Sequence, residues 1–356
     1  MNLRNGILVF NLMLFLFPAA LFQREIELQY HEVKEKYNPD FNELWSAGFG
    51  KIIVRSFLNN KKEGGLLFEN GQFRVAYPGF SRIVKKNNKR KFSLWGWLIT
   101  RNYSWLDNSD LYDTEYIDHK RKKIKKLDIF DPEIRNKISK VFRDLTKLGV
   151  EGILIQDDLS IKSNEGFSLK GMKTFSDISG VPAREKLMMD SGSPYNLKWI
   201  KIKKKVIAAL RNKIIKECRA INPDIKIGIN VFYEASLFAR KSNEWHSQDL
   251  KEIVDSDVDY IYLMMYHRQM KRELKYGIHR IKKLFKKGIE NAVMLAGDRL
   301  VVKMETYDWN KRELIPVGEM EEFIKLIPEN VKRICFTPAK NGDLKYFKRI
   351  LKAAKN

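Results

Sequence analysis

The sequence predicts an α/β protein in which strands and helices alternate and close into a (β/α)8 TIM barrel. Strand-like apolar segments and amphipathic helical segments alternate along the chain after residue 23, and polar residues recur where successive strands end. No linker-like stretch divides this region. Repeated strand–helix alternation favours a parallel sheet, and eight such units are typical of a closed barrel. We therefore expect one domain over residues 24–356.

The first 23 residues differ from this pattern. Arg4 is followed by an uncharged apolar run from Gly6 to Phe22, and the next charge is Arg24. A basic start and a short apolar core are typical of a secretory signal. Residues 1–23 therefore predict a signal peptide or an N-terminal anchor, and we expect export to the periplasm, the cell envelope or the extracellular space. Their length leaves open whether they are cleaved or remain as a membrane tether.

The expected elements follow from apolar periodicity. Strands are expected at 26–32, 51–57, 92–99, 153–155, 226–232, 259–266, 292–296 or 300–305, and 333–337. Helices are expected at 41–47, 77–86, 131–148, 197–219, 249–254, 278–287 and 319–326. The charged stretch 107–126 has no periodicity and predicts a long loop. The insertion 160–196 contains Gly, Ser and Pro and is expected to lie over the strand ends.

The composition limits the class of partner. The chain has 356 residues and a formal net charge of +23, which alone would suggest a polyanion. The charge is spread over several runs, as is typical of solvated loops and outer helix faces, so we expect no nucleic-acid partner. Cys218 and Cys335 lie in apolar patterns without metal-type spacing. We expect a monomer that uses neither a metal nor a cofactor.

Two adjacent carboxylates follow the fourth expected strand, in the sequence GILIQDDL. A buried carboxylate without a partner is costly, and the carboxyl ends of barrel strands are where chemistry is placed. The simpler alternative is that one Asp caps the following turn. Because strand side chains alternate, Gln156 and Asp158 are expected to face inward, with Asp157 on the rim unless the strand has already bent.

Polar and aromatic residues recur at the ends of the other strands, which core packing does not require. Aromatic rings beside carboxylates are typical of a sugar site, and glycoside hydrolysis needs two acids about 5 to 9.5 Å apart. The predicted catalytic residues are Asp157, Asp158 and Glu165, the last being the nearest loop candidate for a partner acid. The predicted substrate-binding residues are His31, Arg101, Tyr103, Trp105, Asn230, Tyr233, Tyr266, His267, Glu305, Asp308 and Trp309. A single histidine among them has a simpler explanation as a hydrogen-bonded structural residue.

Several segments, taken in order, carry a resemblance: FSLWGWLI, DIFDPEIRNKISKVFRDL, GVEGILIQDDL, IKIGINVFYEASL, EWHSQDLKEIVDSDVDYIYLMMY and METYDW. With them the chain resembles the C-terminal glycoside hydrolase domain of PgaB-type poly-β-1,6-N-acetylglucosamine deacetylases. The resemblance implies an exported barrel that cleaves a partly de-N-acetylated β-1,6-glucosamine polymer, a biofilm exopolysaccharide, in a surface groove. Asp157 and Asp158 match the family's acidic pair, Glu165 falls in the acidic stretch after it, and Trp309 matches a groove aromatic. No deacetylase activity is implied.

The chain departs from that family at two strand ends. Arg268 stands near the end of the sixth strand, where the family has an acid, and Gln29 stands in the first strand where an acid is expected. Two hypotheses therefore stay open. The first is an exported glycoside hydrolase that acts on an amino-sugar polysaccharide through paired carboxylates. The second is a barrel that only binds polysaccharide during its export or in the matrix.

Overall fold

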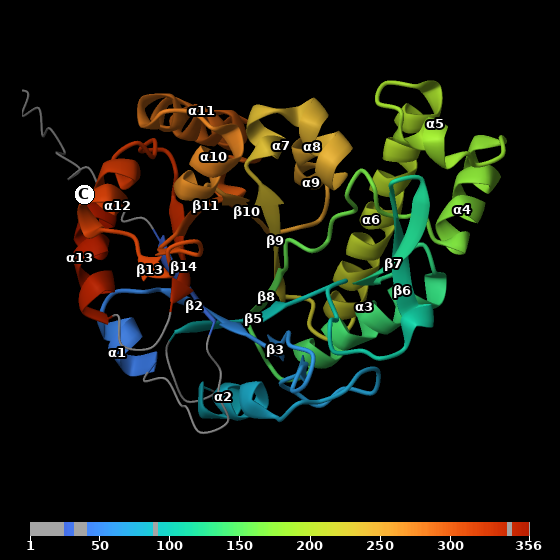
Figure 1. Ribbon diagram of the computed structural model, residues 1–356. Coiled ribbons are helices and arrows are strands. Elements are labelled where there is room, and N and C mark those ends of the chain that lie inside the picture. Colours follow the sequence, from blue (N-terminus) through green and yellow to red (C-terminus); the bar gives the residue numbers. More distant parts are fainter. Residues whose placement is uncertain (1–24, 32–40, 88–91, 340–343, 356) are drawn as a thin grey trace, which may run out of the picture.

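The computed structural model describes residues 25–31, 41–87, 92–339 and 344–355, and its centre is a closed barrel of parallel strands (Figure 1). The hydrogen-bonded order β1-β2-β5-β8-β9-β10-β11-β14 follows the chain around the ring. The strands are β1 Glu25–Tyr30, β2 Lys51–Arg55, β5 Ser93–Leu98, β8 Gly152–Ile155, β9 Lys226–Phe232, β10 Tyr260–Met264, β11 Leu300–Glu305 and β14 Arg333–Ala339. The predicted (β/α)8 fold is confirmed. The predicted signal segment lies outside the described residues.

Helices surround the barrel and bury their apolar sides against it (Figure 1). They are α1 Phe41–Ser46, α2 Gly79–Asn87, α3 Pro132–Thr146, α4 Leu169–Ser179, α5 Glu185–Met189, α6 Pro194–Arg219, α7 Glu234–Leu237, α8 Ala239–His246, α9 Leu250–Val254, α10 His267–Leu274, α11 Ile278–Ala296, α12 Val317–Ile324 and α13 Leu344–Lys355. Short hairpins join β3 Phe57–Leu58 to β4 Gly65–Leu66 and β12 Tyr307–Asp308 to β13 Glu313–Leu314. Within the described ranges, every helix is too short or too polar to cross a membrane.

The expected loop at 107–126 is wrong. The segment forms a 3-10 turn, Ser109–Leu111, and a hairpin of β6 Tyr112–Ile117 with β7 Lys120–Leu127. The hairpin lies outside the barrel and most of β7 is exposed, so the strand lacks the apolar alternation that would have revealed it. Asp118 and His119 turn the chain with φ of +50° and +60°, the backbone that two-residue hairpin turns require.

The seventh barrel strand is the second of the two expected positions. Residues 300–305 form β11, whereas 292–296 continue helix α11. The insertion 160–196 carries α4, α5 and the start of α6, and it packs against the hairpin through backbone bonds from Tyr116 to Asn164 and from Phe167 to Thr114. The hairpin and the insertion therefore form one outer layer beside the strand ends (Figure 1).

The barrel interior holds large rings opposite glycines. A Cβ on Gly152 would lie 2.2 Å from the Trp95 ring, and one on Gly228 would lie 2.5 Å from the Tyr262 ring. Glycine in a strand often marks such a close approach. Leu98 of β5 pairs with Ile155 of β8, so the two strands end level. The residues that follow them, 99–105 and 156–160, therefore leave the barrel side by side.

Candidate active site

The chain bends directly after β8, and the two aspartates then point in different directions. Gln156 faces inward as expected, because its Oε1 accepts from Trp97 Nε1 of β5. β8 ends at Ile155 and a turn begins at Asp157, so the two-residue alternation no longer applies. The expected inward position of Asp158 is therefore wrong, and each carboxyl is placed by its contacts rather than by the strand.

Asp158 points toward the loop that follows β5. Its Oδ1 accepts from Thr100 N at 3.0 Å and from Thr100 Oγ1 at 2.8 Å. Its Oδ2 accepts from Arg101 N and Asn102 N, each at 2.7 Å. Backbone amides that converge on a carboxylate make charge-assisted hydrogen bonds with it. This arrangement resembles a cap on a neighbouring loop more than a free acid.

Asp157 is partly buried and lies at the mouth of the barrel. Burial raises the pKa of its carboxyl, the positive charge of Lys303 opposes that shift, and the charge of Asp158 adds to it. Burial also raises the pKa of the Tyr266 hydroxyl, and the charges of Asp157 and Glu305 raise it further. Asp157 follows the fourth barrel strand and Glu305 ends the seventh, so both carboxyls lie at the carboxyl end of the barrel.

Glu305 ends β11 and is 0% exposed. Its Oε1 accepts from Arg268 N at 2.6 Å and from Gln269 N at 3.3 Å, at the start of α10. Its Oε2 is buried and has no hydrogen-bond partner in the described part of the chain. Burial raises the pKa of Glu305, and the nearby His267 opposes the shift. The sequence placed Glu305 among the substrate-binding residues; the structure makes it the second carboxyl of the mouth.

Lys303 is a residue of this site that sequence reasoning missed. It lies inside the barrel, 2% exposed, and its Nζ donates to Asn230 Oδ1 at 2.8 Å. Burial lowers its pKa to about 8, while the charges of Asp157 and Glu27 oppose that shift. A lysine between apolar residues in the strand LVVKME was the available signal, because a buried lysine needs a partner. Asn230, predicted to bind substrate, is that partner.

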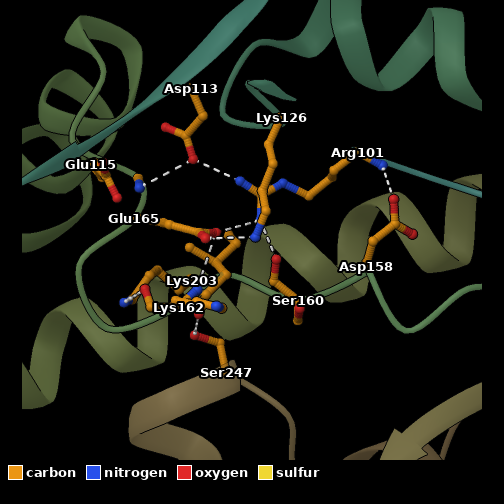
Figure 2. Close-up of polar contacts among 12 residues, drawn as sticks. Arg101, Asp113, Glu115, Lys126, Asp158, Ser160, Lys162, Glu165, Lys203 and Ser247 are labelled. Atoms are coloured by element: carbon orange, nitrogen blue, oxygen red, sulfur yellow. Dashed lines mark hydrogen bonds and ion pairs between the residues drawn. The ribbon is translucent and has the colours of Figure 1, made fainter. Parts of the chain in front are cut away.

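Arg101 and Glu165 belong to a buried ion-pair cluster beside the mouth (Figure 2). Arg101 Nη2 lies 2.7 Å from Asp113 Oδ2, its Nη1 lies 3.0 Å from Glu165 Oε2, and Nη1 also donates to the Ser160 carbonyl. Lys126 Nζ lies 2.6 Å from Glu165 Oε1. Arg101 is 0% exposed. The cluster joins the loop after β5, the β6–β7 hairpin and the loop after β8.

The cluster corrects two expectations. Burial alone would raise the pKa of Glu165, but Arg101 and Lys126 outweigh it and lower the pKa to about 2. A carboxyl that stays ionised cannot donate a proton as a general acid near neutral pH. Every nitrogen of the Arg101 guanidinium already bonds to the Leu127 carbonyl, the Ser160 carbonyl, Glu165 or Asp113, so the side chain is fully engaged within the protein. We therefore assign both residues a structural role.

Three aromatic residues predicted to bind substrate are also enclosed. Tyr103 and Trp105 pack with their ring centroids 4.9 Å apart, and Phe73 covers Tyr103 at 4.7 Å. Tyr233 is buried, and its hydroxyl donates to Glu273 Oε2 at 2.9 Å. Sequence reasoning could not separate such packing rings from sugar-stacking rings, because both occur at strand ends.

His267 and Asp308 lie in a second set of ion pairs, around Arg268. His267 Nε2 lies 2.8 Å from Glu319 Oε1. Arg268 Nη2 lies 2.7 Å from Glu319 Oε2, and its Nη1 lies 2.8 Å from Asp308 Oδ2. These contacts hold the pKa of Asp308 and of Glu319 below their usual values. Arg268, which stands near the position of a family acid, here fixes the start of α10 beside Glu305.

Trp309 is the most exposed aromatic among the predicted binding residues, at 48%. Its ring centroid lies 6.0 Å from His31 and 5.2 Å from Tyr307. His31 in turn lies 4.4 Å from the ring of Trp97, next to Gln156. A row of rings thus leads from an exposed tryptophan to the residue that precedes Asp157.

Carboxyls at the ends of the fourth and seventh strands of a closed parallel barrel, beside an aromatic row, define the class of barrel glycoside hydrolases. The family model described as "Hypothetical glycosyl hydrolase family 13" (GHL13) matches residues 90–336. That span is more than half of the chain, and the protein belongs to this family. No curated protein matches the sequence at a significant level.

Solved structures share this fold at low sequence identity. The glycoside hydrolase domain of PgaB (BpsB) from Bordetella bronchiseptica matches with a TM-score of 0.76 and 16% identity, over 92% of this chain and 99% of that one. A GH42 β-galactosidase from G. stearothermophilus matches with a TM-score of 0.65 and 10% identity, over 94% of this chain and 57% of that one. The first match confirms the resemblance inferred from the sequence, and the second shows that the barrel is common to other glycosidases.

Proposed function

We propose that the protein hydrolyses an amino-sugar polysaccharide at the carboxyl end of its barrel, with Asp157 and Glu305 as the two acids. The observation that carries this proposal is that Asp157 follows β8 and Glu305 ends β11, so both carboxyls lie at the carboxyl end of the closed parallel barrel. Asp158 and Glu165, the other two predicted catalytic residues, are held by backbone amides and by ion pairs. Glycoside hydrolysis needs two carboxyls that flank the scissile bond. The sugar must therefore bind between Asp157 and Glu305.

Burial raises the pKa of both carboxyls, but two backbone amides bond to Glu305 and favour its charged form, so we assign Glu305 as the ionised partner and Asp157 as the acid. Asp157 is partly buried and has a raised pKa, so it can stay protonated and donate to the leaving oxygen. Glu305 has an unbonded Oε2 and would activate water or attack the sugar carbon, depending on the separation of the acids in the complex. Glu305 is 0% exposed, so a sugar can reach its carboxyl only if the side chains around it move.

The substrate class is supported by the similarity to the PgaB hydrolase domain and by the exposed ring of Trp309. A sugar ring stacked on Trp309 would extend past His31 and Trp97 toward Asp157, because these rings form a continuous row. We infer a polymer substrate in the periplasm, the cell envelope or the extracellular space, to which residues 1–23 would direct the chain. Linkage and the degree of acetylation are the variables that an assay should scan.

The test is the release of reducing ends from a panel of polymers by the purified protein. The panel contains β-1,6-linked N-acetylglucosamine polymer at several degrees of de-N-acetylation, and β-1,4-linked chitosan as the linkage control. We expect release from the partly de-N-acetylated β-1,6 polymer and none with Asp157→Asn. A wild-type protein that binds these polymers but cleaves none of them would leave only the polysaccharide-binding hypothesis.

A further inference from the structure

The side chain that follows the proposed acid ties together two loops of the mouth. The Asp158 carboxylate accepts three consecutive backbone amides, of Thr100, Arg101 and Asn102, as well as the Thr100 hydroxyl. Charge-assisted hydrogen bonds of this kind are short and strong. With four donors on two oxygens, Asp158 has no lone pair directed to a substrate, and its role must be exerted through the loop that it holds.

The segment that carries Asp158, directly after β8, is held by further contacts at residues 157–161. Arg101 donates from its guanidinium to the Ser160 carbonyl, while Ser160 Oγ donates to the Asp157 carbonyl at 3.1 Å. One residue further, Ser247 Oγ donates to the Ile161 carbonyl at 2.8 Å. Residue 157 thus lies directly before a segment in which Asp158 and Ser160 both bond to Arg101, as Figure 2 shows for these three residues.

The anchor itself is rigid, because both ends of Arg101 are held. Its backbone amide bonds to Asp158, and its buried guanidinium pairs with Asp113 and Glu165. Asp113 comes from the β6–β7 hairpin and also accepts from Gly166 N at 3.1 Å. The hairpin, which lies outside the barrel, therefore braces the loop that carries Asp157.

We propose that Asp158 is a positioning residue for Asp157, acting with Arg101 as a clamp that fixes the direction of the Asp157 carboxyl. This inference rests on the proposed function, since it assigns Asp157 the chemistry. It differs from the prediction made from the sequence, in which Asp157 and Asp158 were both candidate catalytic residues. Catalytic groups lose efficiency when misplaced by about 1 Å. Loss of the contacts between Asp158 and the loop after β5 should therefore lower kcat, although Asp158 does not contact the substrate.

The experiment replaces Asp158 by Asn, which keeps the size of the side chain but turns one acceptor into a donor against the three amides. Asp259→Asn is the matched control, because Asp259 also accepts a backbone amide, from Ile227 at 2.8 Å, but at the opposite end of the barrel. We expect Asp158→Asn to lower kcat by about 10-fold or more with KM within about twofold, whereas the control changes neither. Amides 156–162 should exchange faster with deuterium in Asp158→Asn only.

A pH profile separates positioning from direct proton donation. If Asp158 only positions Asp157, the residual activity of Asp158→Asn should still fall at high pH, because the Asp157 acid is still present and loses its proton there. If Asp158 were itself the acid, that loss would disappear, kcat would fall to the level of Asp157→Asn, and exchange of 156–162 would not change. Unchanged kcat together with unchanged exchange would also overturn the proposal.

A milder variant keeps the proposal testable if Asp158→Asn fails to fold. Thr100→Val removes only the hydroxyl bond to Asp158 and keeps the backbone amide, so it should lower kcat in the same direction by a smaller factor. Failure of the wild type on every polymer would refute the proposed function, while the exchange measurement would still test the clamp. An active wild type with normal exchange in Asp158→Asn would refute the clamp alone.

Discussion

Lys303 Nζ lies 2.8 Å from Asn230 Oδ1 inside the barrel, one layer below the proposed acids. A lysine and an asparagine thus occupy positions that apolar side chains fill in most barrels of this type. The charge of Lys303 is near enough to Asp157 to lower the pKa of its carboxyl. A change at Lys303 inside the barrel should therefore alter the pKa of the Asp157 carboxyl at the mouth.

Replacing Lys303 by Met should therefore move the pH profile. Asp157 as a general acid must be protonated, so activity falls as the pH rises through its pKa. Removing the positive charge raises that pKa, so the high-pH limb of the plot of kcat against pH should shift to higher pH. The measurement is kcat from pH 4 to 9, with Lys51→Met as the control, because Lys51 is buried at the other end of the barrel and pairs with Glu27. A shift of this limb to lower pH would contradict the assignment of Asp157 as the acid.

Asp157→Asn should reduce kcat by about 10²- to 10⁴-fold, the usual contribution of a general acid. The change removes one proton donor and keeps the shape of the side chain, so binding of the polymer should persist. Reducing-end release and a binding isotherm measure the two effects separately. Asp224→Asn is the control, because Asp224 is exposed near the start of β9. Equal activity of the two variants would remove Asp157 from the mechanism.

Glu305→Gln should also abolish most of the activity, because an amide can neither attack the sugar carbon nor activate water. The Gln carbonyl can still accept from the amides of Arg268 and Gln269, so the start of α10 should keep its structure. We expect a loss of at least about 100-fold with little change in Tm. Glu151→Gln, an exposed change beside the start of β8, serves as the control. Full activity of Glu305→Gln would mean that another carboxyl supplies the second acid.

Glu165→Gln should change stability in a pH-dependent way. The pKa of Glu165 is lowered to about 2, so its charge stabilises the fold above its unfolded pKa of about 4.3, and this contribution is lost as the pH falls toward 2. A shift of this size corresponds to about 3 kcal/mol at neutral pH. The variant should unfold at lower urea than wild type at pH 7, and the two should converge near pH 2. A constant difference across that range would contradict the ion-pair origin.

Trp309→Ala should weaken binding of the polymer by about 3- to 10-fold, the effect of losing one stacking contact, with Tm unchanged because the ring is half exposed. Trp45→Ala is the matched control. Trp45 is 42% exposed on α1, which precedes the start of β2 and lies away from the mouth. Equal loss of binding in both variants would point to a nonspecific contribution of surface aromatics.

The fold was predictable because it depends on local pattern. The strands 51–57, 226–232 and 333–337 are each rich in apolar residues, as is typical of strands buried on both faces, and the number and spacing of such segments imply the barrel. The hairpin at 112–127 was not predictable in this way. Its second strand, KRKKIKKL, is exposed along most of its length, and an exposed strand need not carry any periodic apolar signal.

Residue type and position at a strand end located the mouth, and Asp157, Glu305 and Trp309 were found there from sequence. What each carboxyl does was decided by its neighbours. Asp157 and Asp158 are adjacent and chemically identical, yet one accepts three amides of a neighbouring loop while the other lies near Lys303 and Tyr266. The sequence by itself determined that acids and rings gather at one end of eight strands. Only the tertiary structure decided which carboxyl is held by a neighbouring loop and which lies among charged groups at the end of the barrel, because burial, opposing charges and hydrogen-bond donors come from segments far apart along the chain.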